Sequence, residues 1–336
     1  MRNQNMNVIQ DLGAMKAKEN GKFDPLSNFQ IYCAYSERKL MELPAGSVSL
    51  SLWSPPYFVG KEYEKGVSYQ AWQDMLREVI KAHFYILKPG GFLVINIADI
   101  LCFKDPKMPR IQANNVSKRR CAVTSEMVLE AQRQHPSFTR YQLAELLGCS
   151  EQTVDRRLHG NNIRGGKHEI QTRVKLVGGA LEQYGLSAGL FLYDHRIWHK
   201  DPAWANSRWT SNTYKAVSEY EDLYVFWKPG EYAVNKSKLT AAEWKDWGLR
   251  GVWEIASVRK NDDHEAKFPL ELAEKIIRLY SEQGDTVIDP FVGSGTSGIA
   301  ALKLGRPFIG IDKEPQYAAL SIKNITDYFS QGWLFS

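Results

Sequence analysis

Residues 287–305 have the sequence VIDPFVGSGTSGIAALKLG, and this stretch decides the fold of the 336-residue chain. It predicts a strand over 285–289, a turn, and a helix that runs from Gly295 to a C-terminal cap at Gly305. Gly293 and Gly295 permit a tight turn with close backbone approach, so a ligand can lie against the strand's carboxyl end and the helix N terminus. The stretch therefore predicts an α/β fold with a ligand site at this turn.

An acidic residue completes the predicted ligand site. A further strand is expected over 307–312, and Asp312 ends it about 20 residues beyond Gly293, where a carboxylate can bind both hydroxyls of a ribose. A phosphate-binding loop needs Gly-Lys-Ser/Thr after its glycines, whereas Gly295 is followed by Thr296 and Ser297. The sequence thus favours a nucleoside-containing ligand over a nucleoside triphosphate.

Strands and helices alternate on both sides of a central break. Such alternation is typical of an α/β sheet. We expect strands over 47–53, 92–99, 190–198 and 221–227, and helices over 68–87, 169–184, 269–283 and 315–329.

The composition is that of an ordinary globular protein, with 43% hydrophobic and 24% charged residues. The four cysteines have no C-x-x-C spacing, so we expect no metal site and no disulfide framework. Residues 1–23 contain no apolar segment, and no stretch reaches the ~18–20 apolar residues that a membrane span needs. We therefore expect a cytoplasmic chain that does not contact a membrane.

The positive charge is concentrated in one segment. Residues 104–175 contain fourteen Lys and Arg against seven Asp and Glu, and the rest of the chain contains 29 basic and 31 acidic residues. A basic segment binds a polyanion through counterion release, and it can equally be a solvated face without a partner.

This segment contains a helix-turn-helix pattern over 137–162. Leu143, Leu146 and Leu147 are expected to face a core, Gly148 to open the turn and Ser150 to cap the second helix, which buries Val154 and Leu158. The outward positions are then those that a recognition helix offers to DNA, and an ordinary helical hairpin with exposed arginines is the alternative. The candidate DNA contacts here are Gln152, Thr153, Arg156 and Arg157, beside Glu151.

The tetrapeptide Ser54-Pro55-Pro56-Tyr57 follows the first predicted strand. The prolines donate no N–H and fix the backbone, so their carbonyls can point outward as acceptors. Together with the Ser54 hydroxyl, these carbonyls can hold the exocyclic amine of a nucleic-acid base by two hydrogen bonds while the Tyr57 ring stacks on that base. Alone, the tetrapeptide would indicate only a turn that ends a strand.

Several motifs together resemble the β-class DNA amino-methyltransferases of restriction–modification systems. They are SLSLWSPPY, LKPGGFLVINIAD, RIWHK, YVFWKPG, HEAKFP and VIDPFVGSGTSGIAALKLGRPFIGID, in that order over about 31–101 and 170–330. The resemblance implies a Rossmann-like methyltransferase fold, S-adenosyl-L-methionine as cofactor and a base amine of double-stranded DNA as substrate. The Ser form of the tetrapeptide is typical of N4-cytosine enzymes, and the Asp form is typical of N6-adenine enzymes.

The resemblance also assigns residues. Ser54, Pro55, Pro56 and Tyr57 match the catalytic motif. The matches to the cofactor site are Asp289, Pro290, Phe291, Gly293, Gly295, Thr296, Asp312, His264, Lys267 and Phe268. The family usually has a Gly-Asp pair before the catalytic strand, where this sequence has Ala34-Tyr35.

The place of target recognition differs from the family pattern. Only 33 residues separate YVFWKPG from HEAKFP, too few for the usual recognition domain. We therefore expect an N-terminal arm (1–30), a catalytic half (31–103), a basic helical insertion that recognises the target (104–168) and the remaining methyltransferase domain (169–336). Arg208, with Trp204 and Trp209, can also reach DNA or the cleft, or belong to a packed aromatic loop.

Three functions remain open at this point. The first is methylation of the N4 amine of a cytosine flipped out of the duplex, with Ser54 and the Pro55 carbonyl holding the amine. The second is N6-adenine methylation on the same scaffold, and the third is a non-catalytic DNA-binding protein. C5-cytosine methylation requires a thiolate, and no cysteine lies near the tetrapeptide. A single helix-turn-helix reads a short site alone or a palindrome as a homodimer, and a cognate restriction endonuclease is a further candidate partner.

Overall fold

The computed structural model describes residues 8–10, 23–58, 67–105, 107–108, 111–112, 122–159, 169–170, 172–202, 214–232, 234–258 and 269–331. Its contacts divide the chain into two compact units. The sheet unit comprises residues 1–103, 174–202 and 218–336, and the helical unit comprises residues 104–173 and 203–217.

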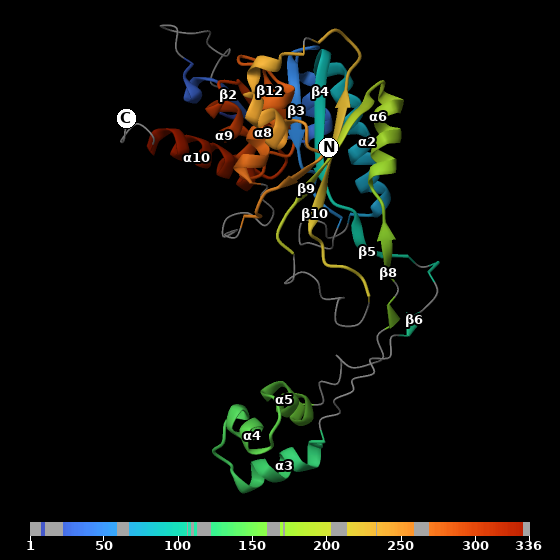
Figure 1. Cartoon of the computed structure of the whole chain (residues 1–336), viewed down its shortest axis with the longest axis vertical. Helices are drawn as coiled ribbons and strands as arrows, with labels where there is room; N and C mark the ends of the chain where they lie inside the picture. The colour runs from blue at the N-terminus through green and yellow to red at the C-terminus, as the bar shows by residue number, and fades with distance from the viewer. Residues whose placement is uncertain are drawn as a thin grey trace, which may run out of the picture. The chain divides into compact units, whose positions relative to one another are not determined.

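A nine-stranded sheet, counted over the described residues, forms the centre of the sheet unit (Figure 1). Its order is β1-β2-β13-β12-β3-β4-β10-β9-β11. Strands β2, β13, β12, β3 and β4 are parallel, and β10 is antiparallel to both β4 and β9. The strands are β1 (Val8–Gln10), β2 (Phe29–Cys33), β3 (Val48–Trp53), β4 (Leu87–Ile97), β9 (Phe191–His199), β10 (Tyr220–Trp227), β11 (Val252–Glu254), β12 (Val287–Asp289) and β13 (Phe308–Asp312).

Helices cover both faces of this sheet, as the α/β pattern predicts (Figure 1). Leu76, Ile80 and Leu181 belong to the core on one face, and Leu272, Ile276 and Ile325 belong to the core on the other. The first face carries α1 (Ser36–Glu42), α2 (Tyr69–Ile86) and α6 (Gly178–Ala188), and the second carries α8 (Leu270–Tyr280), α9 (Thr296–Lys303) and α10 (Pro315–Gln331). Short helical turns lie at Pro25–Ser27, Lys236–Lys238, Ala241–Glu243 (α7) and Trp244–Gly248.

The sheet confirms most of the predicted elements and corrects two. The prediction of a helix over 169–184 is wrong, because the chain forms β8 (Thr172–Lys175) there and α6 starts only at Gly178. The arm over residues 1–30 contains β1, which pairs antiparallel with β2. Strands β5 (Ile100–Lys104) and β8 pair with each other, as do β6 (Ile111–Gln112) and β7 (Glu169–Ile170).

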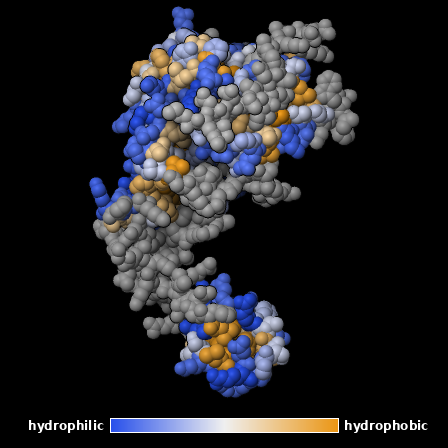
Figure 2. Space-filling model, turned by 180° about the vertical axis from the view of Figure 1, so that it is seen from behind, coloured by the Kyte–Doolittle hydropathy of each residue, from blue (hydrophilic) through white to orange (hydrophobic). Residues whose placement is uncertain are grey.

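The helical unit contains three helices within its described residues, α3 (Ser125–Gln134), α4 (Arg140–Leu146) and α5 (Glu151–His159). They enclose a small core that includes Val128, Leu143 and Val154. The predicted helix-turn-helix corresponds to α4 and α5, with Gly148 at φ +60° in the turn and the Ser150 hydroxyl accepting from the Thr153 N–H. Leu146 was placed in the core wrongly, since it is 52% exposed. Figure 2 shows apolar residues gathered on one side of this unit.

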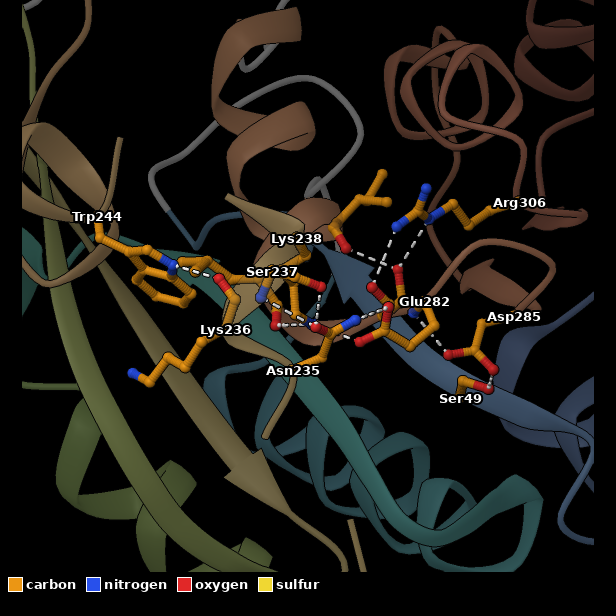
Figure 3. Close-up of polar contacts among 12 residues, drawn as sticks. Ser49, Asn235, Lys236, Ser237, Lys238, Trp244, Glu282, Asp285 and Arg306 are labelled. Atoms are coloured by element: carbon orange, nitrogen blue, oxygen red, sulfur yellow. Dashed lines mark hydrogen bonds and ion pairs between the residues drawn. The ribbon is translucent and has the colours of Figure 1, made fainter. Parts of the chain in front are cut away.

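A polar cluster lies where β3 and β12 begin (Figure 3). Asp285 accepts hydrogen bonds from Ser49 Oγ and Lys88 Nζ, each at 2.7 Å. Arg306 is buried and donates to the backbone carbonyl of Ser281 at 3.1 Å. The protein's own contacts therefore occupy the N-terminal edge of the parallel strands, and a ligand site is to be sought at their C-terminal edge.

Candidate active site

A cavity of about 350 Å³ lies at the C-terminal edge of β2, β3, β12 and β13. The chain proceeds from β12 to β13 in one direction along the sheet and from β3 to β4 in the other. The cavity thus occupies the topological switch point, where open α/β sheets bind their ligands. It brings together the tetrapeptide 54–57, the glycine turn and Asp312, although more than 200 residues separate the tetrapeptide from the other two in the sequence.

The tetrapeptide begins directly after β3, whose six residues are all buried. Ser54, Pro55, Pro56 and Tyr57 all line the cavity. The prediction that both proline carbonyls point outward is wrong for Pro56, because its carbonyl accepts a 2.7 Å hydrogen bond from Trp72 Nε1. Within the described residues the Pro55 carbonyl accepts no hydrogen bond, so it stays available to a ligand.

A partly buried hydrogen-bonded network extends from the tetrapeptide. Ser54 Oγ donates to Tyr57 Oη at 2.9 Å, and Tyr57 Oη donates to Glu221 Oε2 at 2.6 Å. Asn96 Nδ2 donates to the same Glu221 oxygen at 2.7 Å, and Lys200 Nζ pairs with Glu221 Oε1. β10 runs antiparallel to β4, so Glu221 at its start lies beside the end of β4 that carries Asn96. No local sequence pattern connects these residues, and the network was therefore missed at the level of the sequence.

The glycine turn lies between β12 and α9, as predicted. Gly293 and Gly295 have φ of +50° and +86°, which only glycine adopts readily. A Cβ on Gly295 would also lie 3.2 Å from backbone atoms of Ser321, so this turn fits closely under α10. Phe291 and Thr296 line the cavity on either side of the turn, and the Pro290 carbonyl accepts from the Ser36 hydroxyl.

Two carboxylates lie at the ends of the adjacent strands β12 and β13, and Asp289 is buried whereas Asp312 is partly buried. Asp289 accepts from Phe291 N–H at 2.9 Å and from Ser297 Oγ at 2.5 Å, and burial raises its pKa to about 7. Asp312 accepts from Gly293 N–H at 3.1 Å, and burial raises its pKa above the ordinary value although two backbone N–H groups oppose this. Both carboxylates are therefore expensive to ionise without a cationic or hydroxyl-bearing ligand.

The cavity wall has an acidic character. Glu37, Asp289, Asp312 and Glu314 line it, and among the described residues that line it Lys313 is the single basic one. Glu37 lies two residues after Tyr35, which stands in the place of the family's usual Gly-Asp pair. This segment therefore does bring a carboxylate to the cavity, from the first turn of α1.

Six candidate residues belong to two segments of the sequence. His264, Lys267 and Phe268, and Arg208 with Trp204 and Trp209, lie outside the described residues.

The candidate DNA contacts of the helical unit lie on α5. Gln152 and Arg156 are exposed, and Thr153 is partly buried. Arg157 is also partly buried, and its Nε donates to the Val123 carbonyl at 2.9 Å. The structure thus leaves Arg156 as the more exposed arginine of this helix.

Comparison with known proteins identifies the family. Residues 48–323 match the family model for N6/N4 DNA methylases, described as DNA methylase. The chain belongs to the N6/N4 DNA methylase family. The methylase is 59% identical over 283 residues to the type II methyltransferase M.BglI of Bacillus subtilis, and the match covers 84% of this chain and 81% of the relative.

Two solved structures share the fold of the methylase. A protein of Thermus thermophilus, described as a putative DNA modification methylase and solved with S-adenosyl-L-methionine, has a TM-score of 0.56 at 24% identity, over 88% of this chain and 93% of the other. The cytosine-N4-specific PvuII DNA methyltransferase has a TM-score of 0.56 at 19% identity, over 90% and 92%. The predicted family and its Rossmann-like fold are confirmed. No helix among the described residues is long and apolar enough to cross a membrane.

Proposed function

We propose that this methylase transfers a methyl group from S-adenosyl-L-methionine to the exocyclic N4 amine of a cytosine that is flipped out of duplex DNA. The observation that carries the proposal is the single cavity shared by the Ser54 tetrapeptide, the glycine turn and Asp312. The Ser form of the tetrapeptide favours cytosine. The same fold in a cytosine-N4-specific methyltransferase is compatible with this choice.

The cavity fits the cofactor in charge and in shape. S-adenosyl-L-methionine carries a sulfonium and an ammonium group, and the acidic wall of the cavity complements both while disfavouring phosphates. Asp312 suits the ribose hydroxyls, the turn at Gly293 and Gly295 lets the backbone approach the ligand, and Phe291 supplies an apolar surface. When bound, the cofactor supplies an electrophilic methyl group.

The residues of the tetrapeptide orient the amine. The cytosine amine is a poor nucleophile because its lone pair is delocalised into the ring. Ser54 Oγ and the Pro55 carbonyl can accept its two hydrogens, which favours a tetrahedral nitrogen whose lone pair points away from the ring plane. Phe58, Trp72 and Met75 give one part of the cavity wall an apolar surface, which would exclude water from the reacting atoms.

Target recognition is assigned to the helical unit. The support is the basic excess of residues 104–175, the helix-turn-helix formed by α4 and α5, and the exposed Arg156. The relation to a type II methyltransferase supports a site-specific enzyme of a cytoplasmic restriction–modification system, with a cognate endonuclease as partner. A homodimer would suit a palindromic site.

Product identity tests the proposal. The purified methylase is incubated with S-adenosyl-L-methionine and mixed-sequence duplex DNA, which is then digested to nucleosides and examined by mass spectrometry. N4-methylcytosine is the expected product. N6-methyladenine would show that Ser54 does not determine the base and would assign the enzyme to the adenine branch of the family. The absence of both products, with cofactor binding confirmed and genomic DNA as a second substrate, would contradict the proposed activity.

A further inference from the structure

We infer that Glu221 directs the Ser54 hydroxyl and receives the proton that the target amine loses, through a chain of two hydrogen bonds that passes Tyr57. This inference rests on the proposed function and adds a proton acceptor that a serine cannot itself provide. A neutral serine is a weak base, so an amine held by Ser54 needs a route for its proton.

The direction in which the two hydrogen bonds are donated follows from the carboxylate at which they end. A carboxylate only accepts hydrogen bonds, so the Tyr57 phenol must donate its proton to Glu221 Oε2, at 2.6 Å. Tyr57 Oη then has only lone pairs left for Ser54, and Ser54 must donate, at 2.9 Å. With its proton committed to Tyr57, Ser54 Oγ presents lone pairs to the cavity, and this is the polarity needed to accept an amine N–H.

The neighbouring side chains hold Glu221 in place. Its side chain is 9% exposed and pairs with Lys200 Nζ, whose side chain is 15% exposed. Asn96 Nδ2 donates to the same oxygen as Tyr57, at 2.7 Å, and lies 3.4 Å from Tyr57 Oη. These contacts hold the carboxylate oxygen at the end of the chain, where a buried carboxylate requires both a cation and hydrogen-bond donors.

The proton balance is complete within these residues. The amine lone pair forms the new bond to the methyl carbon, the electron pair of the broken carbon–sulfur bond stays on sulfur, and the nitrogen becomes positively charged. The nitrogen regains neutrality when one N–H proton passes to Ser54 Oγ, the serine proton passes to Tyr57 Oη, and the phenol proton passes to Glu221 Oε2. Each atom that releases a proton keeps the bonding pair, and the carboxylate ends as a carboxylic acid beside the Lys200 ammonium.

The two hydrogen bonds from Ser54 through Tyr57 end at Glu221 and not at the neighbouring carboxylate, Asp222. The Asp222 side chain is buried to a similar extent, at 10% exposed, but it binds His195 Nε2 at 2.8 Å rather than the tetrapeptide. Asp222→Asn is therefore a matched control for Glu221→Gln, because both replace a buried carboxylate of β10 by its amide.

The test measures single-turnover methylation with saturating cofactor and DNA. Glu221→Gln and Tyr57→Phe are each expected to lower the rate roughly 100-fold, in the range of general acid–base effects. The affinities of Tyr57→Phe for cofactor and DNA should stay near the parental values, because Phe keeps the aromatic ring. The double variant should be no slower than either single variant, because both changes interrupt one chain. The parental rate should fall in D₂O, and the rate of Tyr57→Phe should not.

Three results would overturn the inference: a parental rate in Tyr57→Phe, a loss in Asp222→Asn equal to that in Glu221→Gln, or multiplied losses in the double variant. If Glu221→Gln does not bind the cofactor, Tyr57→Phe decides alone, since it leaves the Glu221–Lys200 pair intact. Failure of the proposed function looks different, because the parental enzyme would then yield no methylated amine at all.

Discussion

Replacing Asp289 by Asn should stabilise the ligand-free methylase at neutral and alkaline pH. The Asp289 side chain is buried, and its pKa is raised from 3.8 to about 7. A raised carboxyl pKa means that the folded state binds the proton more tightly than the unfolded state does. Its contribution to stability is therefore complete below pH 3.8 and is lost as the pH rises to 7. The shift of about 3 units corresponds to about 4 kcal/mol.

Asn is a suitable replacement for geometric reasons. Its Oδ1 can accept from the Phe291 N–H, and its Nδ2 can donate to Ser297 Oγ, so both hydrogen bonds of Asp289 are kept. The free energy of unfolding is measured with urea between about pH 4 and pH 8, followed by tryptophan fluorescence. The variant and parental proteins should agree near pH 4, and the variant should be more stable by up to about 4 kcal/mol above pH 7. Asp327→Asn, on the exposed face of α10, is the control and should show no such trend.

The same variant also tests how the ionisation of Asp289 affects cofactor binding. A cationic cofactor favours the ionised form of Asp289, so the affinity of the parental enzyme for S-adenosyl-L-methionine should rise from about pH 6 to pH 8, and that of Asp289→Asn should be weaker and flat. A stability difference that is independent of pH, or that grows toward acid, would refute the assignment of a costly carboxylate to this cavity.

Three further predictions concern other parts of the molecule. Ser54→Ala should keep cofactor affinity and lose most turnover, measured by methyl incorporation into DNA; unchanged turnover would remove Ser54 from the reaction. Arg156→Ala should weaken DNA binding, as measured by fluorescence anisotropy at several salt concentrations. If the Arg156 guanidinium contacts a phosphate, the slope of log K for DNA binding against log salt concentration should fall in magnitude by about 1. An identical slope in variant and parent would contradict DNA contact through α5. His83 is buried, and burial lowers its pKa from 6.5 to about 4, so stability should fall as the pH drops from 6.5 to 4, by about 3 kcal/mol. Urea unfolding of a Ser51→Ala/His83→Phe double variant, which removes both partners of the buried 2.7 Å hydrogen bond, should show a flatter acid limb, and equal limbs would be evidence against a neutral buried histidine.

The sequence was most informative where structure depends on neighbouring residues. The turn at 293–295 requires glycine because both positions have positive φ, and Asp312 ends a short buried strand that a β-rich run indicates. These features are local, and they placed the glycine turn and the acid correctly at one edge of the sheet. Thr172–Lys175 was misassigned as helix because its strand character comes from pairing with β5, about 70 residues earlier in the chain.

The part of the site that could not be predicted is held together by tertiary contacts. Glu221 is one charged residue among several at the start of a strand, and only the antiparallel register of β10 against β4 brings it to Tyr57. Leu146 lies at helical spacing from Leu143, but α4 ends there and leaves it exposed. The Pro56 carbonyl was expected to face a ligand, and its indole partner, Trp72, comes from a helix whose docking the sequence pattern does not specify.

The strand order also has a consequence for biosynthesis. β12 is inserted between β13 and β3, yet it is made more than 230 residues after β3. On the ribosome, the fully buried environment of β3 is incomplete until residues 287–312 have emerged, and its inner edge remains open until then. Such long-range pairing is slow and leaves an unpaired edge exposed, so nascent chains that stall before β12 should be prone to aggregation and dependent on chaperones. The arrangement that joins the two halves of the active site therefore also delays activity until residues 287–312 have been made.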